Sequence, residues 1–256
     1  MRLRARSALV AAALVAVLGA ACGGGGGDAT LGPEVAPSTA AVPTAPAGPP
    51  LAYVAQAIVP KLGIYSQPGD ATAARELDNP WVVDPDYPDQ TVPQVFLVEQ
   101  RRADGWAQVL LPVRPNGSTG WVRTSDVHIT ANPYRVVVEL GAHRITVQQG
   151  DTVLYTGPVA VGAPDTPTPT GTYYVRVEVK AIDPTTVYGP YAWGLSSHSD
   201  ALESFNGGDG EIGIHGNNDA SVLGQNVTHG CVRMDNDAIT NLTKTLPLGT
   251  PVTIEA

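Results

Sequence analysis

"NVTHGCVRM", residues 226–234, contains Cys231, one of only two cysteines in a chain of 256 residues. His229 lies two positions before this cysteine, and Arg233 lies two positions after it. The other cysteine, Cys22, belongs to a segment that reads as a secretion signal, so we expect no disulfide within the folded part. A remaining thiol in an exported protein is either reactive or paired between molecules.

A second histidine, His215, precedes Cys231 by sixteen residues. A free thiol has a pKa of about 8.5 and is only slightly ionised at neutral pH, so a nucleophilic cysteine needs a base that takes its proton. His215 and His229 are both candidates, and His215 is freer to face the sulfur because it arrives from a separate strand. Gly230 lacks a Cβ and lets the backbone N–H groups of residues 229–231 point into one concavity, as an oxyanion hole requires.

These residues resemble the catalytic domain of the L,D-transpeptidases of bacterial cell-wall synthesis. The resemblance rests on "HG" at 215–216, a glycine nine residues after the histidine, and "THGCVRM" at 228–234. The segments "PVAVG" (158–162), "TPTPTG" (166–171) and "GPYAWGLS" (189–196) also match. The resemblance covers residues 134–256 and implies a mostly β, sandwich-like catalytic domain.

The resemblance also implies the roles of individual residues. Cys231 is the nucleophile, His215 is the base, and the backbone of His229, Gly230 and Cys231 forms the oxyanion hole. The residues predicted to contact substrate or shape the pocket are Arg233, Tyr191, Trp193, Gly216 and Asn217. For Arg233, a plain salt bridge with Asp235 or Asp237 is the alternative.

The sequence departs from the family pattern after "HG", where Asn217–Ala220 replaces a segment that often begins with threonine. This departure leaves open which group orients His215. A backbone carbonyl near Gly216 and the side chain of Asn217 are the two candidates.

The reaction that the resemblance implies is a two-step acyl transfer on peptidoglycan stem peptides. Cys231 attacks the diamino-acid residue at position three of a tetrapeptide and releases D-alanine, and a second stem opens the thioester to give a 3,3 cross-link. Acylation by carbapenems is expected at the same cysteine. The alternatives are an L,D-carboxypeptidase, a sortase-like enzyme, or a wall-binding scaffold whose catalytic domain is inactive.

Metal and cofactor sites are not expected. Histidine and cysteine are zinc ligands, but no fourth ligand stands at metal spacing beside His215, His229 and Cys231. The remaining histidines are scattered along the chain at His128, His143 and His198.

The N-terminus is predicted to direct export. Arg2, Arg4 and Arg6 precede an apolar run at 8–18, and small residues lead to Cys22, which resembles a lipoprotein signal over residues 1–22. Lipidation of Cys22 would anchor the protein to the outer face of the cytoplasmic membrane, and ordinary secretion is the alternative. Residues 23–50 are rich in Gly, Ala and Pro and are predicted to form a disordered tether.

Residues 51–130 are predicted to form a small β-domain that resembles bacterial SH3-like barrels. Short β-rich runs recur there, two Gly-Trp pairs start strands, and "RPNGSTG" (114–120) predicts a hairpin turn. Residues 78–93 are predicted to be a long irregular loop. In the rest of the chain, residues 235–246 are the one clear helix candidate, with Asp235 as its cap. The formal net charge of −9 argues against nucleic acid as a partner.

Overall fold

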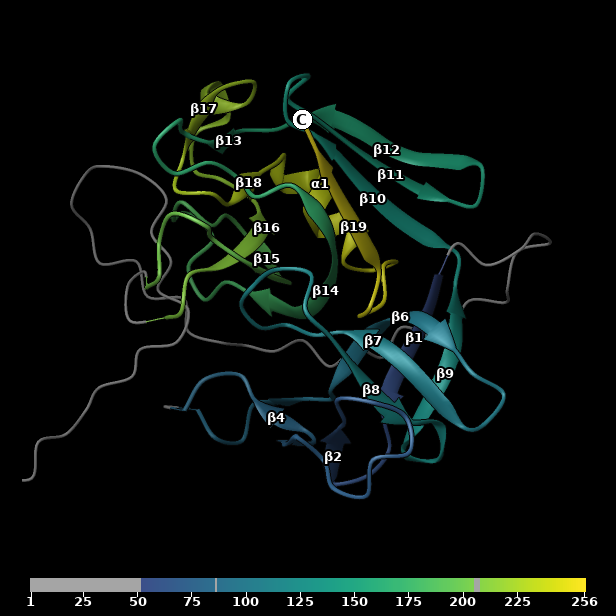
Figure 1. Cartoon of the computed structure of the whole chain (residues 1–256). Coiled ribbons are helices and arrows are strands. Elements are labelled where there is room, and N and C mark those ends of the chain that lie inside the picture. Colours follow the sequence, from purple (N-terminus) through teal and green to yellow (C-terminus); the bar gives the residue numbers. More distant parts are fainter. Residues whose placement is uncertain (1–51, 86, 205–207) are drawn as a thin grey trace, which may run out of the picture.

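The computed structural model describes residues 52–85, 87–204 and 208–256 (Figure 1). The predicted secretion signal, the Cys22 lipidation site and the predicted tether lie outside these residues. Within them the chain is mostly β, with one short α-helix, as the sequence predicts. This helix, α1, is seven residues long, and no helix in the described part has the length and apolar character needed to cross a membrane.

The N-terminal unit is built on a five-stranded antiparallel sheet of order β8-β7-β6-β1-β9. The strands are β1 (Ala52–Ala57), β6 (Val95–Arg101), β7 (Trp106–Leu110), β8 (Thr119–Arg123) and β9 (Val127–Asn132), with a 3-10 turn η1 (Thr124–Asp126) before β9. The predicted hairpin is present as β7 and β8. Alternating residues of these strands fill a core that contains Phe96, Val109 and Val122, each fully buried.

Two small strand pairs complete this unit. They are β2 (Lys61–Ile64) with β3 (Arg75–Asp78), and β4 (Trp81–Val82) with β5 (Thr91–Val92). The prediction of an irregular loop over residues 78–93 is therefore wrong in part, because β4 and β5 pair antiparallel inside it. Val83 and Val92 are buried against another part of the chain, and this burial orders a segment whose sequence carries few strand signals.

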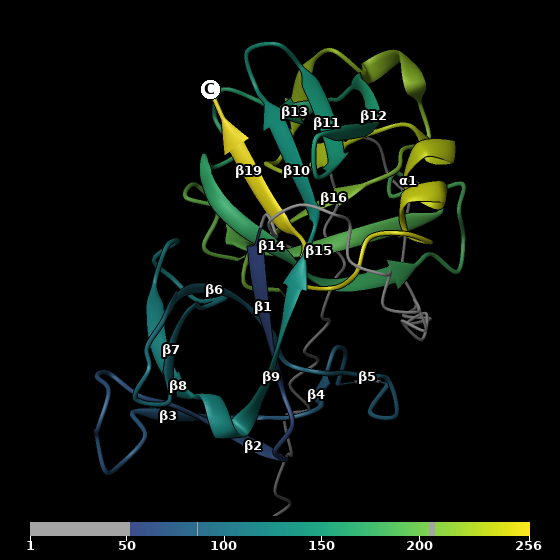
Figure 2. The same ribbon diagram turned by 90° about the vertical axis from the view of Figure 1, so that its right-hand side faces the viewer.

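The C-terminal unit is an eight-stranded sheet of order β12-β11-β10-β19-β14-β15-β16-β18 (Figure 2). Its strands are β10 (Tyr134–Glu139), β11 (Arg144–Gln149), β12 (Thr152–Pro158), β14 (Gly171–Lys180), β15 (Tyr191–His198), β16 (Glu211–His215), β18 (Val232–Arg233) and β19 (Pro251–Glu255). A separate pair joins β13 (Val161–Gly162) to β17 (Asn226–Thr228), and η2 (Ala220–Val222) is a 3-10 turn.

Strand β14 connects the two halves of this sheet. Its first residues, Gly171–Tyr174, pair with β19, and its later residues, from Val175 to Lys180, pair with β15. A register shift between Val175 and Val177 marks the change of partner, and such irregularities bend a strand. The sheet therefore curves around a core that includes Trp193, Ile214 and Met234.

Helix α1 (Asn236–Leu242) packs on this core through Ala238, Ile239 and Leu242. The Asp235 carboxylate accepts a 2.8 Å hydrogen bond from the Ala238 N–H, so the predicted cap is confirmed. The helix ends four residues earlier than predicted, although Leu246 is still buried and its N–H donates to the Leu242 carbonyl.

The two units are in direct contact. Tyr174 of β14 is fully buried in the core of the N-terminal unit, and Val177 and Val179 pack against Val83 and Val92. Arg114, in the β7–β8 turn, donates hydrogen bonds to the carbonyl oxygens of Ser199, Leu202 and Asp209. Beside it, Asn116 accepts from the His198 N–H at 2.9 Å and donates to the His198 carbonyl at 2.7 Å.

Candidate active site

Cys231 and His215 line the same pocket at the β15–β16–β18 end of the larger sheet. Cys231 is 6% exposed and His215 is 1% exposed, so neither group faces bulk water. The other lining residues are Val179, Tyr188, Ala192, Trp193, Gly194, Glu211, Ile212 and Gly213. The candidate nucleophile and the candidate base, predicted from sequence, therefore lie in one mostly apolar pocket.

Strand pairing brings these two residues together across their sixteen-residue separation. His215 is the last residue of β16, and Cys231 immediately precedes β18. The two strands are parallel, with Ile214 opposite Val232 and His215 opposite Arg233. The chain between them returns through η2 and β17, so Cys231 enters the pocket beside the strand that carries His215.

The hydrogen bond at His215 Nδ1 determines which ring nitrogen can act as a base. Nδ1 lies 2.7 Å from the Gly216 carbonyl oxygen. A carbonyl oxygen only accepts, so Nδ1 must carry the proton and Nε2 keeps its lone pair. Nε2 is buried and has no hydrogen-bond partner among the described residues. The Tyr188 ring packs against the imidazole at 5.1 Å between centroids.

Of the two groups proposed to orient His215, the structure has the Gly216 carbonyl in that position. Asn217 has a different role. Its Nδ2 donates to the Met234 carbonyl at 2.7 Å, and its backbone exchanges hydrogen bonds with the Asn236 side chain. Asn217 thus joins the end of β16 to the start of α1 and does not line the pocket.

The turn before Cys231 has the backbone shape expected from its glycine. Gly230 has φ of +117°, and a Cβ there would lie 2.8 Å from Ile212 Cδ1. The Gly230 N–H donates to the Thr228 hydroxyl at 3.2 Å, and this hydroxyl donates to the Cys231 carbonyl at 2.6 Å. The oxyanion-hole role of His229, Gly230 and Cys231 stays a prediction, and for Gly230 it requires this N–H to change its partner.

The other predicted site residues divide into two groups. Trp193 lines the pocket, whereas Tyr191, Gly216, His229 and Arg233 are not among its lining residues. Arg233 is 5% exposed, and its backbone forms two 2.9 Å hydrogen bonds with Ala160.

Tyr188 and Glu211 are the two polar side chains of the pocket lining that were not predicted from the sequence. Glu211 is four positions before His215, and alternate residues of a strand share a face, so the spacing was an available signal. Its carboxylate pairs with Arg176, and each side chain is 16% exposed. Burial raises the pKa of Glu211, although the nearby Arg176 charge lowers it.

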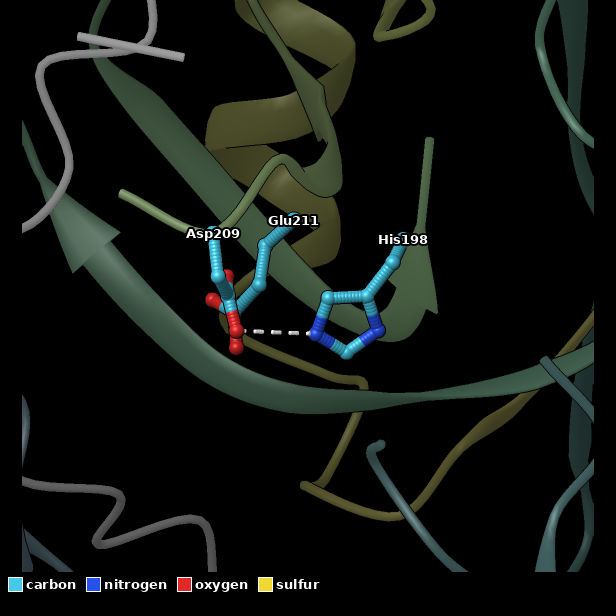
Figure 3. A group of neighbouring side chains, drawn as sticks. All are labelled: His198, Asp209 and Glu211. Atoms are coloured by element: carbon cyan, nitrogen blue, oxygen red, sulfur yellow. Dashed lines mark hydrogen bonds and ion pairs between the residues drawn. The ribbon is translucent and has the colours of Figure 1, made fainter. Parts of the chain in front are cut away.

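One group of side chains in the described residues has the composition of a metal site. His198, Asp209 and Glu211 each offer a ligand atom, and these atoms lie within 4.8 Å of one another (Figure 3). His198 Nε2 already contacts Asp209 Oδ2 at 3.1 Å, and Glu211 is paired with Arg176. Because the Arg176 guanidinium already neutralises the Glu211 carboxylate, the charges of this group favour an ion-pair network over a divalent metal.

Comparison with known proteins places this site in a family. The model of the L,D-transpeptidase catalytic domain, YkuD, matches residues 133–254. The YkuD protein of Bacillus licheniformis is 32% identical over 154 residues, which are 57% of this chain and 85% of that protein. The chain belongs to the YkuD family of L,D-transpeptidase catalytic domains.

One further relative agrees with this assignment. YkuD of Bacillus subtilis is 34% identical over 122 residues, and the chain spans 66% of the length of that protein. Among solved structures, an L,D-transpeptidase from Mycobacterium smegmatis aligns with 16% identity and a TM-score of 0.42, over 64% of this chain and 90% of that one.

Proposed function

We propose that this protein is a peptidoglycan L,D-transpeptidase that joins stem peptides through 3,3 cross-links. The observation that carries the proposal is the shared pocket of Cys231 and His215, with His215 Nδ1 held by the Gly216 carbonyl and Nε2 left to accept a proton. Family membership supports the same chemistry.

In the first step, His215 Nε2 takes the Cys231 proton and the thiolate attacks the carbonyl of the diamino-acid residue at position three. The S–C bond forms, the amide bond to D-alanine breaks, and the proton passes from His215 to the leaving amine. In the second step an amine of another stem attacks the thioester and gives a proton to His215 Nε2. The new amide C–N bond forms, the C–S bond breaks, and the sulfur leaves as the thiolate, which takes the proton back from His215. A thioester reacts well with amines, and a pocket that excludes water favours this route over hydrolysis.

The same thioester chemistry leads us to expect acylation of Cys231 by carbapenems. Export, anchoring by a lipid at Cys22 and an SH3-like role for the N-terminal unit belong to the same proposal. An L,D-carboxypeptidase remains the second candidate, because water instead of an amine would then open the acyl-enzyme.

Product analysis tests the proposal. The purified protein is incubated with disaccharide tetrapeptide, and the masses of the muropeptides are measured for the wild type and for Cys231→Ala. Release of D-alanine with a cross-linked dimer, in the wild type only, is the expected result. Free tripeptide without dimer would identify a carboxypeptidase, and an unchanged substrate would contradict both enzymatic assignments.

A further inference from the structure

One peptide group, between Gly216 and Asn217, connects the base to a side chain outside the pocket. The carbonyl oxygen of this group, on Gly216, lies 2.7 Å from His215 Nδ1. Its N–H, on Asn217, donates a 2.8 Å hydrogen bond to Asn236 Oδ1. Because a peptide group is planar, the direction in which its N–H points fixes the direction of its carbonyl. The Asn236 side chain therefore sets how the Gly216 carbonyl faces the imidazole.

Asn236 contacts Asn217 at two points. Its Oδ1 accepts from the Asn217 N–H, and its Nδ2 donates to the Asn217 carbonyl at 2.9 Å. A single hydrogen bond allows the two groups to pivot, whereas two bonds from one planar amide fix both distance and orientation. Asn236 is the first residue of α1 and is half-buried, so the packed helix holds this side chain in place.

Two glycines leave room for the Asn236 oxygen. A Cβ on Gly216 or on Gly189 would collide with Asn236 Oδ1, since that oxygen is the nearest atom to both positions. A side chain at either position would displace the oxygen from the Asn217 N–H. The close approach of Asn236 to the Gly216–Asn217 peptide group is therefore built into the surrounding backbone.

The segment that carries the nucleophile also carries this contact. Asn236 follows Cys231 by five residues, and Met234, between them, donates its N–H to the His215 carbonyl at 2.9 Å. The Met234 carbonyl accepts a 2.7 Å hydrogen bond from Asn217 Nδ2. These two bonds and the two from Asn236 fix the end of β16, which carries the base, against the segment that carries the thiol.

We propose that Asn236 is a positioning residue for the base. By binding the Gly216–Asn217 peptide group, it keeps His215 in the tautomer that has its proton on Nδ1, so that Nε2 is free to take the proton of Cys231. This inference rests on the proposed function, and it concerns a residue that is not among those lining the pocket. Asn236 acts only through the peptide group that lies between it and the imidazole.

The charge that develops during the reaction strengthens the same hydrogen bonds. When Nε2 takes the proton of Cys231, the imidazole of His215 becomes positive and its Nδ1–H donates more strongly to the Gly216 carbonyl. Hydrogen bonds in a chain polarise one another, so a carbonyl whose peptide N–H is bound to Asn236 is a better acceptor. No proton moves at Asn236, whose amide stays neutral throughout.

The ring tautomer of His215 tests the inference without requiring turnover. It is read from proton–nitrogen NMR spectra of protein with isotopically labelled histidine, in the Cys231→Ala background, where no thiol shares the proton. We expect the Nδ1–H tautomer alone when Asn236 is present, and a mixture of both tautomers after Asn236→Ala. An unchanged tautomer in a folded Asn236→Ala protein would overturn the inference.

Kinetics give a second readout in protein that retains Cys231. Asn236→Ala is expected to lower the first-order rate of acylation by a carbapenem about 10-fold, because the base is less often in the productive tautomer. The carbapenem concentration that gives half the maximal rate should not change, because Asn236 does not line the pocket. A general loss of structure would change both quantities.

Asn241→Ala is the matched control. Asn241 is an exposed residue of the same helix, and its replacement is expected to leave the tautomer and the acylation rate as in the wild type. Asn236→Asp keeps an acceptor oxygen for the Asn217 N–H, so we expect it to retain the Nδ1–H tautomer and to be acylated within about 3-fold of the wild-type rate.

Asn236→Asp decides the inference if Asn236→Ala does not fold. A folded Asn236→Asp protein that populates both tautomers would overturn it, and one that keeps the Nδ1–H tautomer would support it. A wild-type protein that is not acylated would count against the proposed function alone, because the tautomer comparison does not depend on acylation.

Discussion

His215 is the residue whose environment most limits the chemistry of the pocket. Its Nδ1–H is committed to the Gly216 carbonyl, so only Nε2 can take a proton. Cys231 is buried in a mostly apolar pocket, where an isolated thiolate would be disfavoured without an adjacent base. The two side chains are therefore expected to act as a unit.

Replacing His215 by glutamine is expected to slow acylation of Cys231 by at least about 100-fold, because general-base assistance is lost while the thiol remains. The rate is read by intact-mass spectrometry after mixing with a carbapenem. The matching control is His128→Gln on β9, which lies in the N-terminal unit and should acylate at the wild-type rate. Equal rates for His215→Gln and the wild type would exclude His215 as the base.

The raised pKa of Glu178 predicts that the free energy of unfolding depends on pH. Burial raises the pKa of Glu178 from 4.5 to about 7, although a hydrogen bond from Trp193 lowers it. Between pH 4.5 and 7 the folded state binds more protons at this group than the unfolded state, so its contribution to the unfolding free energy falls as pH rises.

We expect Glu178→Gln to remove this loss. As pH rises from below 4.5 to above 7, the unfolding free energy of the variant should increase relative to that of the wild type by up to roughly 3 kcal/mol. Urea unfolding of both proteins at several pH values measures the difference. Parallel stability profiles for the two proteins would show that Glu178 does not titrate in this range.

At the scale of elements, the turn between β17 and β18 determines how Cys231 is presented. Gly230 is in the left-handed region and approaches Ile212 so closely that a side chain would collide with it. The Thr228 hydroxyl stabilises the turn, because it accepts a hydrogen bond from the Gly230 N–H and donates one to the Cys231 carbonyl. A short turn fixed in this way keeps the sulfur beside β16.

For Gly230→Ala we expect a loss of about 1–3 kcal/mol in stability, from backbone strain and from contact with Ile212, together with acylation at least several-fold slower. Thermal unfolding and the carbapenem acylation rate are measured together. Gly117→Ala is the control for strain alone, because Gly117 also has positive φ but has no neighbour within 4 Å of its would-be Cβ. If both variants kept wild-type acylation, the turn would not be needed to position the thiol.

Sequence reasoning was most effective for elements with strong local signals. Short runs rich in β-forming residues predicted the β7–β8 hairpin, and Asp235 marked the start of α1. The pairing of β4 with β5 was missed because the order of this segment comes from packing on β14, which no local pattern reveals. Glu211 was missed for a related reason: its place in the pocket depends on the register of β16 with β18.

Across the whole molecule, the N-terminal unit is joined to the catalytic unit at two places. Apolar contacts bury Tyr174, Val177 and Val179. Arg114 donates hydrogen bonds to three carbonyl oxygens of the segment between β15 and β16. The sequence predicted two β-units but gave no indication that the β7–β8 turn would contact the segment between β15 and β16. The division into domains and the SH3-like classification of the first unit remain predictions.

Removal of the Arg114 contacts by Arg114→Ala is expected to cost about 2–4 kcal/mol of stability, because three carbonyl acceptors lose a charged donor. Chemical denaturation measures the change, and Arg75→Ala on β3, an exposed residue of the same unit, is the control. An Arg114→Ala protein as stable as this control would mean that the two units are not held together by the turn.

Peptide mapping after reaction with a carbapenem shows whether Cys231 is the acylated nucleophile. We expect one adduct per chain, located on the peptide that contains Cys231, and no adduct on Cys231→Ala. An adduct on any other residue, or an unmodified Cys231 after prolonged incubation with a folded wild-type protein, would contradict this expectation.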